Sequence, residues 1–222
     1  MQVWFDCRFV FGDMYFAFDQ LEGILKNQFI LKITQVHGSD GFVVKRDFDF
    51  KNYTPVENDF IITDQKGLLL HVVTADCLPI FLYDPVLKVV GVVHAGWKGS
   101  VAGILDNAIF LMKKEFNTEA KDVHLLFGPC AKNCCYQIKS DCINTMKQFD
   151  STNILDSALI TRGLLTYFDL CMYNIMRAYN VGVLMCNIFT HFSVCTMCTN
   201  NFFSCRKQGE KTGRNINGII LL

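Results

Sequence analysis

The middle of the chain consists of apolar runs that end in potential metal ligands. Leu68 to Ala75, Ile80 to Tyr83 and Val89 to His94 are rich in β-branched and other apolar residues. Short runs of this kind, bounded by turn residues, predict buried strands. Cys77 and His94 each lie where one of these strands is expected to give way to a loop, and strand ends are where loops build sites.

A third potential ligand lies earlier in the chain. The segment Gln35-Val36-His37-Gly38 follows a predicted strand over Phe29 to Val36, so His37 also lies at a strand end. One Cys and two His suit a three-ligand zinc site with an open fourth position, which separates a catalytic zinc site from a structural one. His37, Cys77 and His94 therefore indicate an enzyme with a metal in its active site.

The remaining histidines are expected to be structural. His71 and Cys77 share a predicted strand, where six residues at about 3.3 Å each separate them by roughly 20 Å. Both cannot bind one ion while that strand stays straight. His124 opens a predicted strand and His191 lies inside another, Val183 to Phe192.

Two helical patterns accompany the strands. Gly96 to Ser100 stops the preceding strand and offers Ser100 as the N-cap of an amphipathic helix that reaches Phe116. A second helix is predicted over Thr166 to Tyr179, with Gly182 beyond its end. Strands outnumber helices without strict alternation, which favours an α+β or mixed α/β fold with helices covering a mixed sheet. No linker or repeat divides the chain, so we expect one domain over residues 1–222.

Charge and cysteine usage exclude several classes of protein. Lys and Arg number 21, as do Asp and Glu, so no global field would attract nucleic acid or an anionic membrane. No apolar stretch approaches the roughly 18 residues that a membrane span needs. The first residues lack the basic and apolar regions of a secretory signal. Eleven cysteines, an odd number, are expected to be reduced thiols in a cytoplasm.

Two cysteine motifs resemble known zinc sites but lack the required spacing. Cys195-Thr196-Met197-Cys198 is a C-x₂-C pair, but no second pair follows it at the spacing of a zinc ribbon. The segment from Pro129 to Cys135 has the spacing P-C-x-x-x-C, whereas zinc deaminases require P-C-x-x-C, so the cytidine-deaminase fold is rejected. Lys98, beside a predicted helix N-terminus, indicates a weak anion site that gains weight from its position near His94.

Several ordered motifs together resemble one known family. They run from about Ile33 to the C-terminus, and the pair formed by Ala75-Asp76-Cys77 and His94-Ala95-Gly96-Trp97 is the most specific. The chain thereby resembles the laccase-domain proteins (YfiH-like, polyphenol oxidoreductase laccase), which are also viewed as purine nucleoside phosphorylases. The other motifs are Gln35-Val36-His37-Gly38, Ile62-Thr63-Asp64, Gly128-Pro129 with Cys134-Cys135-Tyr136, and Phe202-Phe203-Ser204 through Thr212-Gly213-Arg214.

The resemblance implies a fold, an activity and a set of site residues. It implies an α+β fold with mixed sheets of sandwich character, covered by helices, and a monomer or weak homodimer. It implies zinc on His37, Cys77 and His94, phosphorolysis of adenosine, inosine and 5′-methylthioadenosine, and deamination of adenosine. We assign the contacts to purine nucleoside and phosphate to Arg8, Gln35, Lys98 and Arg214.

The sequence departs from the family pattern in places. The N-terminal Ser-Thr-Arg-x-Gly-Gly segment of the family is nearly lost, and only Cys7-Arg8 aligns with its Thr-Arg. Lys98 replaces a common Arg, and Cys205-Arg206 stands where Tyr-Arg is usual. These departures leave the three metal ligands intact and affect the contacts to base and ribose.

Three alternative functions stay open at this point. A copper oxidase acting on phenols is possible by ligand chemistry, since His and Cys bind copper more tightly than zinc. Five histidines in the whole chain are too few for the histidine-rich trinuclear centre of true laccases. A metal-free enzyme would use Cys77 as nucleophile and His94 as base. The third alternative is a non-catalytic thiol- or metal-binding protein.

Overall fold

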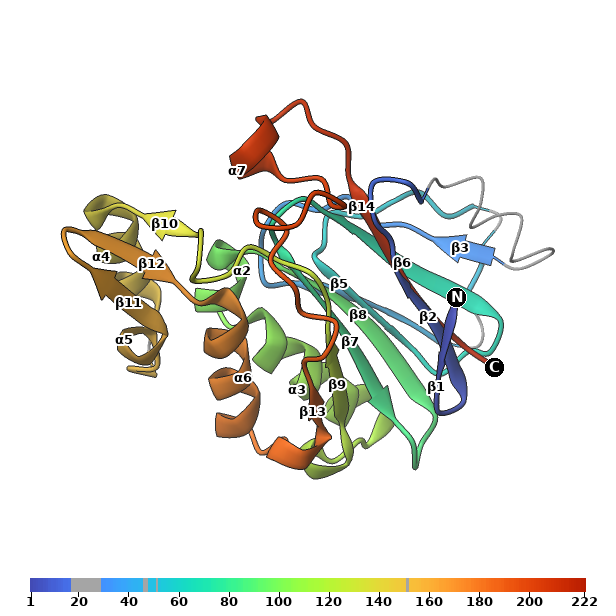
Figure 1. Ribbon diagram of the computed structural model, residues 1–222. Helices are drawn as coiled ribbons and strands as arrows, with labels where there is room; N and C mark the ends of the chain where they lie inside the picture. Colours follow the sequence, from blue (N-terminus) through green and yellow to red (C-terminus); the bar gives the residue numbers. More distant parts are fainter. Residues whose placement is uncertain (17–28, 46–47, 51, 151) are drawn as a thin grey trace.

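Two β-sheets pack face to face, and helices cover the outer face of the larger sheet (Figure 1). The computed structural model describes residues 1–16, 29–45, 48–50, 52–150 and 152–222. The arrangement confirms the expected α+β fold, with mixed sheets of sandwich character covered by helices. Within these residues no helix is long and apolar enough to cross a membrane.

The smaller of the two sheets has five strands. Its order is β1 (Gln2–Trp4), β2 (Cys7–Phe11), β14 (Asn215–Leu221), β6 (Leu68–Thr74) and β3 (Phe29–Leu31). Neighbouring strands are antiparallel except β3 and β6, which are parallel. The last strand of the chain thus lies in the middle of the sheet, and its N-terminal end adjoins the end of β6 that leads toward Cys77, because Asn215 pairs with Thr74.

The larger sheet has six strands, and the candidate site lies at one end of its two central strands. Its order is β13 (Ile188–Phe189), β9 (His124–Phe127), β7 (Leu78–Asp84), β8 (Val89–Ala95), β5 (Phe60–Thr63) and β4 (Gly41–Val44). All seven residues of β7 and of β8 are buried. A strand buried on both faces reads as a continuous apolar run, which is why these two strands were predictable from the sequence.

Helices and a small third sheet cover the outer face of the six-stranded sheet. The helices on this side are α2 (Trp97–Val101), α3 (Ile104–Phe116), α4 (Ser140–Phe149), α5 (Leu155–Ala158) and α6 (Leu170–Asn180), with the 3₁₀ turns η1 (Ala120–Asp122) and η2 (Met185–Asn187). Helix α7 (Cys205–Gln208) lies apart from this face, near β14 (Figure 1). The third sheet has the order β10 (Gln137–Ile138), β12 (Leu165–Phe168), β11 (Leu159–Arg162). Helix α3 buries Ile104, Leu105, Ile109 and Met112 against this face. Each such side chain contributes about 1.5–3 kcal/mol when fully buried.

The predicted helix after Ser100 is in fact two helices. Ser100 lies inside α2 rather than at an N-cap, and its hydroxyl accepts a hydrogen bond from the Asn174 side chain at 2.9 Å. The chain then breaks at Gly103, whose φ of 85° places it in the left-handed region. A β-carbon at Gly103 would come within 2.9 Å of the Arg177 guanidinium, so the close approach of α6 also requires glycine.

Other element boundaries differ from the sequence expectation. Residues 165–168 form β12, and the second helix starts only after Asp169, whose carboxylate caps it by accepting from the backbone N–H of Met172 at 2.9 Å. The strand expected over Phe29 to Val36 ends at Leu31. The strand expected over Val183 to Phe192 is reduced to η2 and the two residues of β13. These segments were short, so tertiary pairing decided their structure.

Candidate metal centre

The pairing of β7 with β8 brings Cys77 and His94 together. Leu78 pairs with Ala95 and Pro79 with His94, so Cys77, one residue before β7, lies at the same end of the strand pair as His94. The loop after β3 adds His37. The ligand atoms of His37, Cys77 and His94 all lie within 4.8 Å of one another. The two imidazole rings meet edge to face, with centroids 4.8 Å apart.

Two glycines allow this close approach. A β-carbon at Gly96 would come within 3.1 Å of the Cys77 sulfur and 3.2 Å of the His37 ring. A β-carbon at Gly99 would lie 2.5 Å from the carbonyl oxygen of Gly38. Any larger residue at either position would push the His37 loop away from α2. The glycines of the Gly-Trp-Lys-Gly segment therefore make room for the ligand cluster.

A buried carboxylate connects two of the three potential ligands. Asp59, which is fully buried, accepts a hydrogen bond from Nδ1 of His94 at 2.7 Å. It also accepts from the backbone N–H groups of Gly38 at 2.6 Å, His37 at 3.0 Å and Val36 at 3.2 Å. Because Nδ1 of His94 carries the proton in this bond, Nε2 is left with a lone pair for a metal. One side chain thus orients the His94 ring and holds the His37 loop.

The backbone is strained at the site. His37 has φ of 61° and Asp76 has φ of 89°, both in the left-handed region that favours glycine. Asp76 is held there by Thr196, whose hydroxyl donates to Oδ1 at 2.7 Å, and by the backbone N–H of Arg206, which donates to Oδ2 at 2.8 Å. The backbone N–H of Ala131 donates to the Asp76 carbonyl at 2.8 Å. Strain of this kind is typical of residues that present functional groups.

The electrostatics of the cluster favour a thiolate. Burial would raise the pKa of Cys77, but the neighbouring His94 and His37 outweigh it and lower that pKa to about 6. Burial would lower the pKa of His94, but Cys77 and Asp59 raise it to about 9. Burial would likewise raise the pKa of Asp59, and its hydrogen bonds from His94 and Gly38 bring it below the usual value. These opposite shifts favour a thiolate on Cys77 beside an imidazolium on His94.

This donor set fits a divalent zinc or copper ion. Two imidazoles and a thiolate are borderline and soft donors of the kind that these ions bind. The orientation of His94 by Asp59 is the outer-shell support that metal-binding histidines usually have. Three protein donors leave a coordination position for a reactant, since His37 is exposed to solvent.

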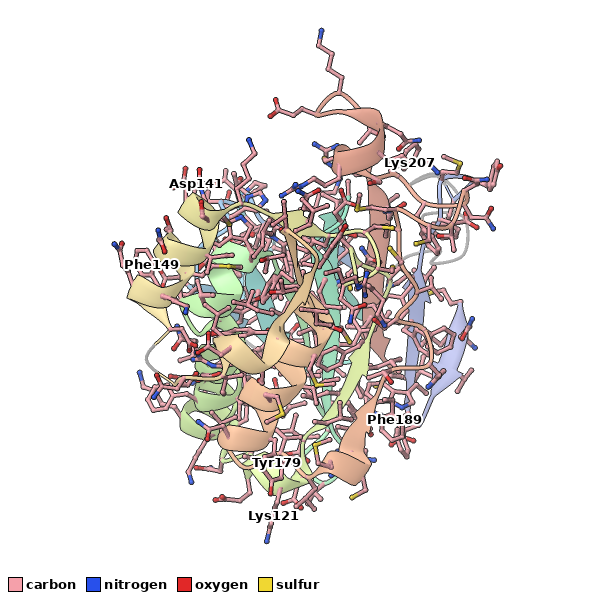
Figure 2. All side chains as sticks on the ribbon, turned by 60° about the vertical axis from the view of Figure 1, so that its left-hand side comes forward. Lys121, Asp141, Phe149, Tyr179, Phe189 and Lys207 are labelled. Atoms are coloured by element: carbon pink, nitrogen blue, oxygen red, sulfur yellow. The ribbon has the colours of Figure 1, made fainter. Side chains whose placement is uncertain are left out.

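A cavity of about 360 Å³ adjoins His37. It is lined mainly by apolar side chains, among them Trp97, Val101 and Phe149, and its one cation is Lys98. Figure 2 shows Phe149 at the outer edge of the molecule, at the end of α4. An apolar cavity with few polar groups is typical of a small-molecule site.

The other residues predicted to contact substrate have different surroundings. Both polar atoms of the Gln35 side chain bind the backbone of Val73 at 2.8 Å, so Gln35 fastens the His37 loop to β6. Arg214 donates to the carbonyls of Thr212 and Gly213 at 2.6 Å and 3.0 Å. Arg8 pairs with Ile220, five residues along β14 from the end near the cluster, or about 17 Å. The structure therefore brings Lys98 to the site and leaves Arg8 away from it.

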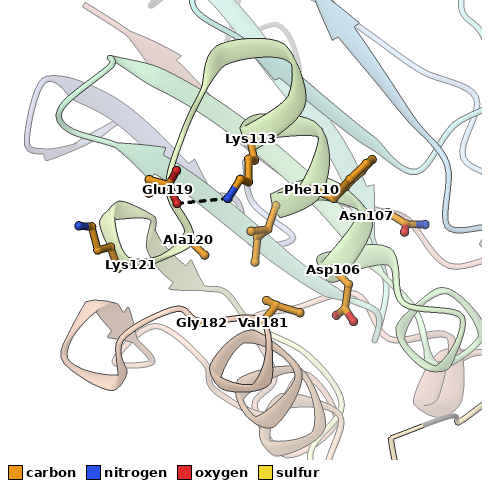
Figure 3. A pocket seen from close by; sticks show the side chains of 10 residues that line it. Asp106, Asn107, Phe110, Lys113, Glu119, Ala120, Lys121, Val181 and Gly182 are labelled. Carbon is orange, nitrogen blue, oxygen red and sulfur yellow. Dashed lines mark hydrogen bonds and ion pairs between the residues drawn. The ribbon is translucent and has the colours of Figure 1, made fainter.

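A second, larger cavity lies elsewhere. It measures about 630 Å³ and is lined by α3, η1 and the turn after α6 (Figure 3). Its charged side chains include Lys113 and Glu119, which form an ion pair at 3.3 Å. None of its lining residues is a histidine or cysteine, and it does not adjoin the metal ligands.

Comparison with known proteins places the chain in a family. Residues 17–222 match the sequence model of the family described as multi-copper polyphenol oxidoreductase laccase. The chain belongs to this family. The match covers His37, Cys77 and His94 and excludes Arg8.

Similar proteins are named for an activity other than the one in the family description. The family member described here is 33% identical to a purine nucleoside phosphorylase of Clostridium acetobutylicum over 167 residues, 74% of this chain and 67% of that protein. It is 29% identical to a purine nucleoside phosphorylase of Borreliella burgdorferi, over 86% of this chain and 80% of that protein. Its structure resembles the hypothetical protein YfiH of Bacillus licheniformis, with a TM-score of 0.81 and 27% identity over 91% of this chain and 79% of that one.

Three residues near the cluster were given no role in the site from the sequence, although Tyr136 and Arg206 stand in the family motifs. Asp59 has no motif around it, and its role follows only from the pairing of β5 with β8. Tyr136 is buried, and both its burial and the nearby Cys77 thiolate raise its pKa. The Arg206 guanidinium lies 4.9 Å from the centre of the Tyr136 ring and donates to the carbonyl of Gln137 at 3.1 Å. In this laccase-family chain, Arg206 is thus a cation closer to the cluster than Arg8.

Proposed function

We propose that this protein is a zinc-dependent purine nucleoside phosphorylase. It would cleave adenosine, inosine and 5′-methylthioadenosine with phosphate, giving the free base and ribose 1-phosphate or its methylthio analogue. The observation that carries the proposal is the cluster of two imidazoles and one thiol within 4.8 Å, beside an apolar cavity with one lysine. The names of the similar proteins support the same reaction.

The proposed roles of the residues follow from their positions. Zinc held by His37, Cys77 and His94 would supply a Lewis acid that orients an anionic nucleophile. Asp59 keeps Nε2 of His94 available as a donor. Lys98 adds a positive charge at the cavity, where it would hold phosphate against the anomeric carbon of the ribose.

The cavity also suits a purine. The ring of Trp97 and the side chain of Phe149 line it. Aromatic rings pack favourably against flat heterocycles, so these residues would bind the base while the ribose faces the metal ligands. Lys98 lies within 5.8 Å of the Trp97 ring, which keeps its ammonium group near the same wall.

Adenosine deamination is proposed as a second activity of the same site. Water in place of phosphate, attacking a purine ring that is turned toward the metal ligands in place of the ribose, would displace the amino group and give inosine and ammonia. His37 is exposed, so water can enter. The two activities separate by product, because only phosphorolysis requires phosphate and releases a free base.

Copper-dependent phenol oxidation is the alternative that the family description raises. Multi-copper oxidases need many histidines, and this chain has five. His71 is buried in β6. His124, in β9, stacks on Phe189 of β13, and His191 lies in the turn after β13. In the described parts of the chain, the one grouping of potential ligands that contains histidine is therefore His37, Cys77 and His94. This histidine distribution favours the phosphorylase.

Metal replacement distinguishes these reactions. Protein stripped of metal and reloaded with zinc should release base from adenosine with phosphate, and copper-loaded protein should not oxidise phenols. Full activity after chelation would instead favour the thiolate–imidazolium pair of Cys77 and His94 as a metal-free catalyst. Copper-loaded protein that oxidises phenols, together with zinc-loaded protein that leaves nucleosides intact, would refute the proposal.

Lys98→Ala tests the phosphate site. We expect its KM for phosphate to rise while its zinc content stays that of the wild type. Lys113→Ala, which removes a lysine from the larger, distant cavity, is the matched control. An unchanged phosphate KM in Lys98→Ala would show that Lys98 does not bind phosphate.

A further inference from the structure

A second group of potential metal ligands lies outside the first cluster. Cys134 and Cys135 come from the loop that follows β9, and Cys195 and Cys198 come from the loop that follows β13. All four sulfur atoms lie within 4.8 Å of one another. The sulfur of Cys198 is 3.3 Å from that of Cys134 and 3.0 Å from that of Cys135.

We propose that these four cysteines bind one structural zinc ion. A tetrahedral ion with Zn–S bonds of about 2.3 Å places its sulfurs roughly 3.8 Å apart. The sulfur–sulfur distances, from 3.0 Å to at most 4.8 Å, lie on both sides of this value. They suit a single ion rather than an iron–sulfur cluster, which needs room for several irons and sulfides. Four protein donors fill the tetrahedron and leave no open position, which is the mark of a structural site.

The backbone around Cys195 is already arranged for a thiolate. The backbone N–H groups of Lys132, Cys198 and Met197 lie near its sulfur and favour negative charge there. Such amides offset negative charge on sulfur and are the outer-shell support that a thiolate ligand needs. The turn Cys195-Thr196-Met197-Cys198 thus serves two purposes, because it places two sulfurs together and points amides at one of them.

Hydrogen bonds between the two loops hold the two cysteine pairs in register. The backbone N–H of Cys130 donates to the carbonyl of Val194 at 3.1 Å, and that of Thr196 donates to the carbonyl of Cys130 at 3.0 Å. The Lys132 ammonium donates to the carbonyl of Ser193 at 2.8 Å. The thiols face one another across this short parallel bridge, so the site is formed by the fold before an ion arrives.

The proposed zinc would brace the wall of the first site. The same two loops hold Asp76, the residue before Cys77, through the backbone of Ala131 and the hydroxyl of Thr196. Tyr136 follows directly after Cys135. An ion that joins the loops therefore limits the movement of the groups around Cys77. The inference goes beyond the phosphorylase proposal and does not depend on it.

Zinc content measured by mass spectrometry tests the proposal. Protein purified under reducing conditions should hold about two zinc ions per chain, and both Cys77→Ala and Cys198→Ser should hold about one. Cys186→Ser is the matched control, because Cys186 is exposed like Cys198 and belongs to neither cluster. The control should keep both ions. Equal zinc content in Cys198→Ser and the control would overturn the second site.

Cobalt substitution provides a second readout, in which all four cysteines of the second site stay unchanged. Cobalt on four thiolates gives a charge-transfer absorption several times stronger than cobalt on one thiolate and two imidazoles. We expect Cys77→Ala, which keeps only the second site, to retain most of this absorption. The proposal would be overturned if Cys77→Ala lost most of the charge-transfer absorption. It would also be overturned if the intact mass of the purified protein showed that the four cysteines form disulfides. Activity is not measured, so failure here leaves the phosphorylase proposal standing.

Discussion

Asp59 is the residue on which the geometry of the first cluster most depends. Its carboxylate accepts four hydrogen bonds, one from His94 and three from backbone amides of the His37 loop. Asp59→Asn keeps the size of the side chain but replaces one acceptor oxygen with an NH₂ group, which itself needs acceptors. The NH₂ group must then face donors, whichever way the amide turns.

The expected losses follow from this mismatch. About two of the four donors lose their partner, and each buried unsatisfied group costs about 1–3 kcal/mol, so the free energy of unfolding should fall by roughly 2–6 kcal/mol. Loss of an outer-shell partner typically lowers metal affinity by about 10–100-fold. Such a loss corresponds to about 1.4–2.8 kcal/mol of zinc-binding free energy.

Asp84→Ala is the control that separates the two effects. Asp84 is also a buried carboxylate, and its Oδ1 accepts from the backbone N–H groups of Val86 at 2.8 Å and Leu87 at 3.0 Å. It lies at the opposite end of β7 from Cys77, seven residues or about 23 Å away. Competition titration with a zinc chelator should show weakened binding in Asp59→Asn alone. Denaturation should show both variants destabilised, because Asp84→Ala leaves two backbone N–H groups without their acceptor. Wild-type zinc affinity in Asp59→Asn would refute the argument that this carboxylate orients the ligands.

Three further predictions concern stability and packing. Burial, with a contribution from a nearby lysine, lowers the pKa of His71 to about 4. Between about pH 6.5 and 4 the unfolded state therefore binds a proton that the folded state does not, and stability should fall as the pH falls through this range. Denaturation curves should show that His71→Gln removes up to about 3 kcal/mol of this fall. Gly96→Ala should lower zinc affinity about tenfold in the chelator titration, because its methyl group would press on the Cys77 sulfur at 3.1 Å, and overpacking costs about 1–3 kcal/mol. Arg177→Met removes the buried guanidinium that pairs with the partly exposed Asp106 at 2.6 Å, and it should lower the free energy of unfolding by about 1–3 kcal/mol. An unchanged melting temperature would show the pair to be dispensable.

The central strands were predictable because each is a single uninterrupted apolar run. β6, β7 and β8 are almost wholly buried, so their sequences carry no competing periodicity. The helix boundary at Gly103 was not predictable, since the apolar spacing of 3.6 continues across the break. Residues 165–168 alternate over only four positions, too few to distinguish a strand from the first turn of a helix.

Some residues of the two sites were likewise predictable from the sequence, and others were not. Cys77 and His94 were recognisable because each marks the end of a strand, and the antiparallel pairing of β7 with β8 then places them together. The role of Asp59 depends on contacts across the sheet that no local pattern encodes. The partners of Cys195 and Cys198 lie about sixty residues earlier, as adjacent cysteines without C-x₂-C spacing, so only the folded chain shows that the four sulfurs meet.

The central claim is tested most directly by identifying the products formed from adenosine. Zinc-loaded protein is incubated with adenosine, with and without phosphate, beside Cys77→Ala, and the products are identified by mass spectrometry. The account predicts adenine and ribose 1-phosphate only when both phosphate and Cys77 are present. Equal release of adenine by Cys77→Ala, or no base released from adenosine, inosine or 5′-methylthioadenosine by zinc-loaded protein in saturating phosphate, would contradict it.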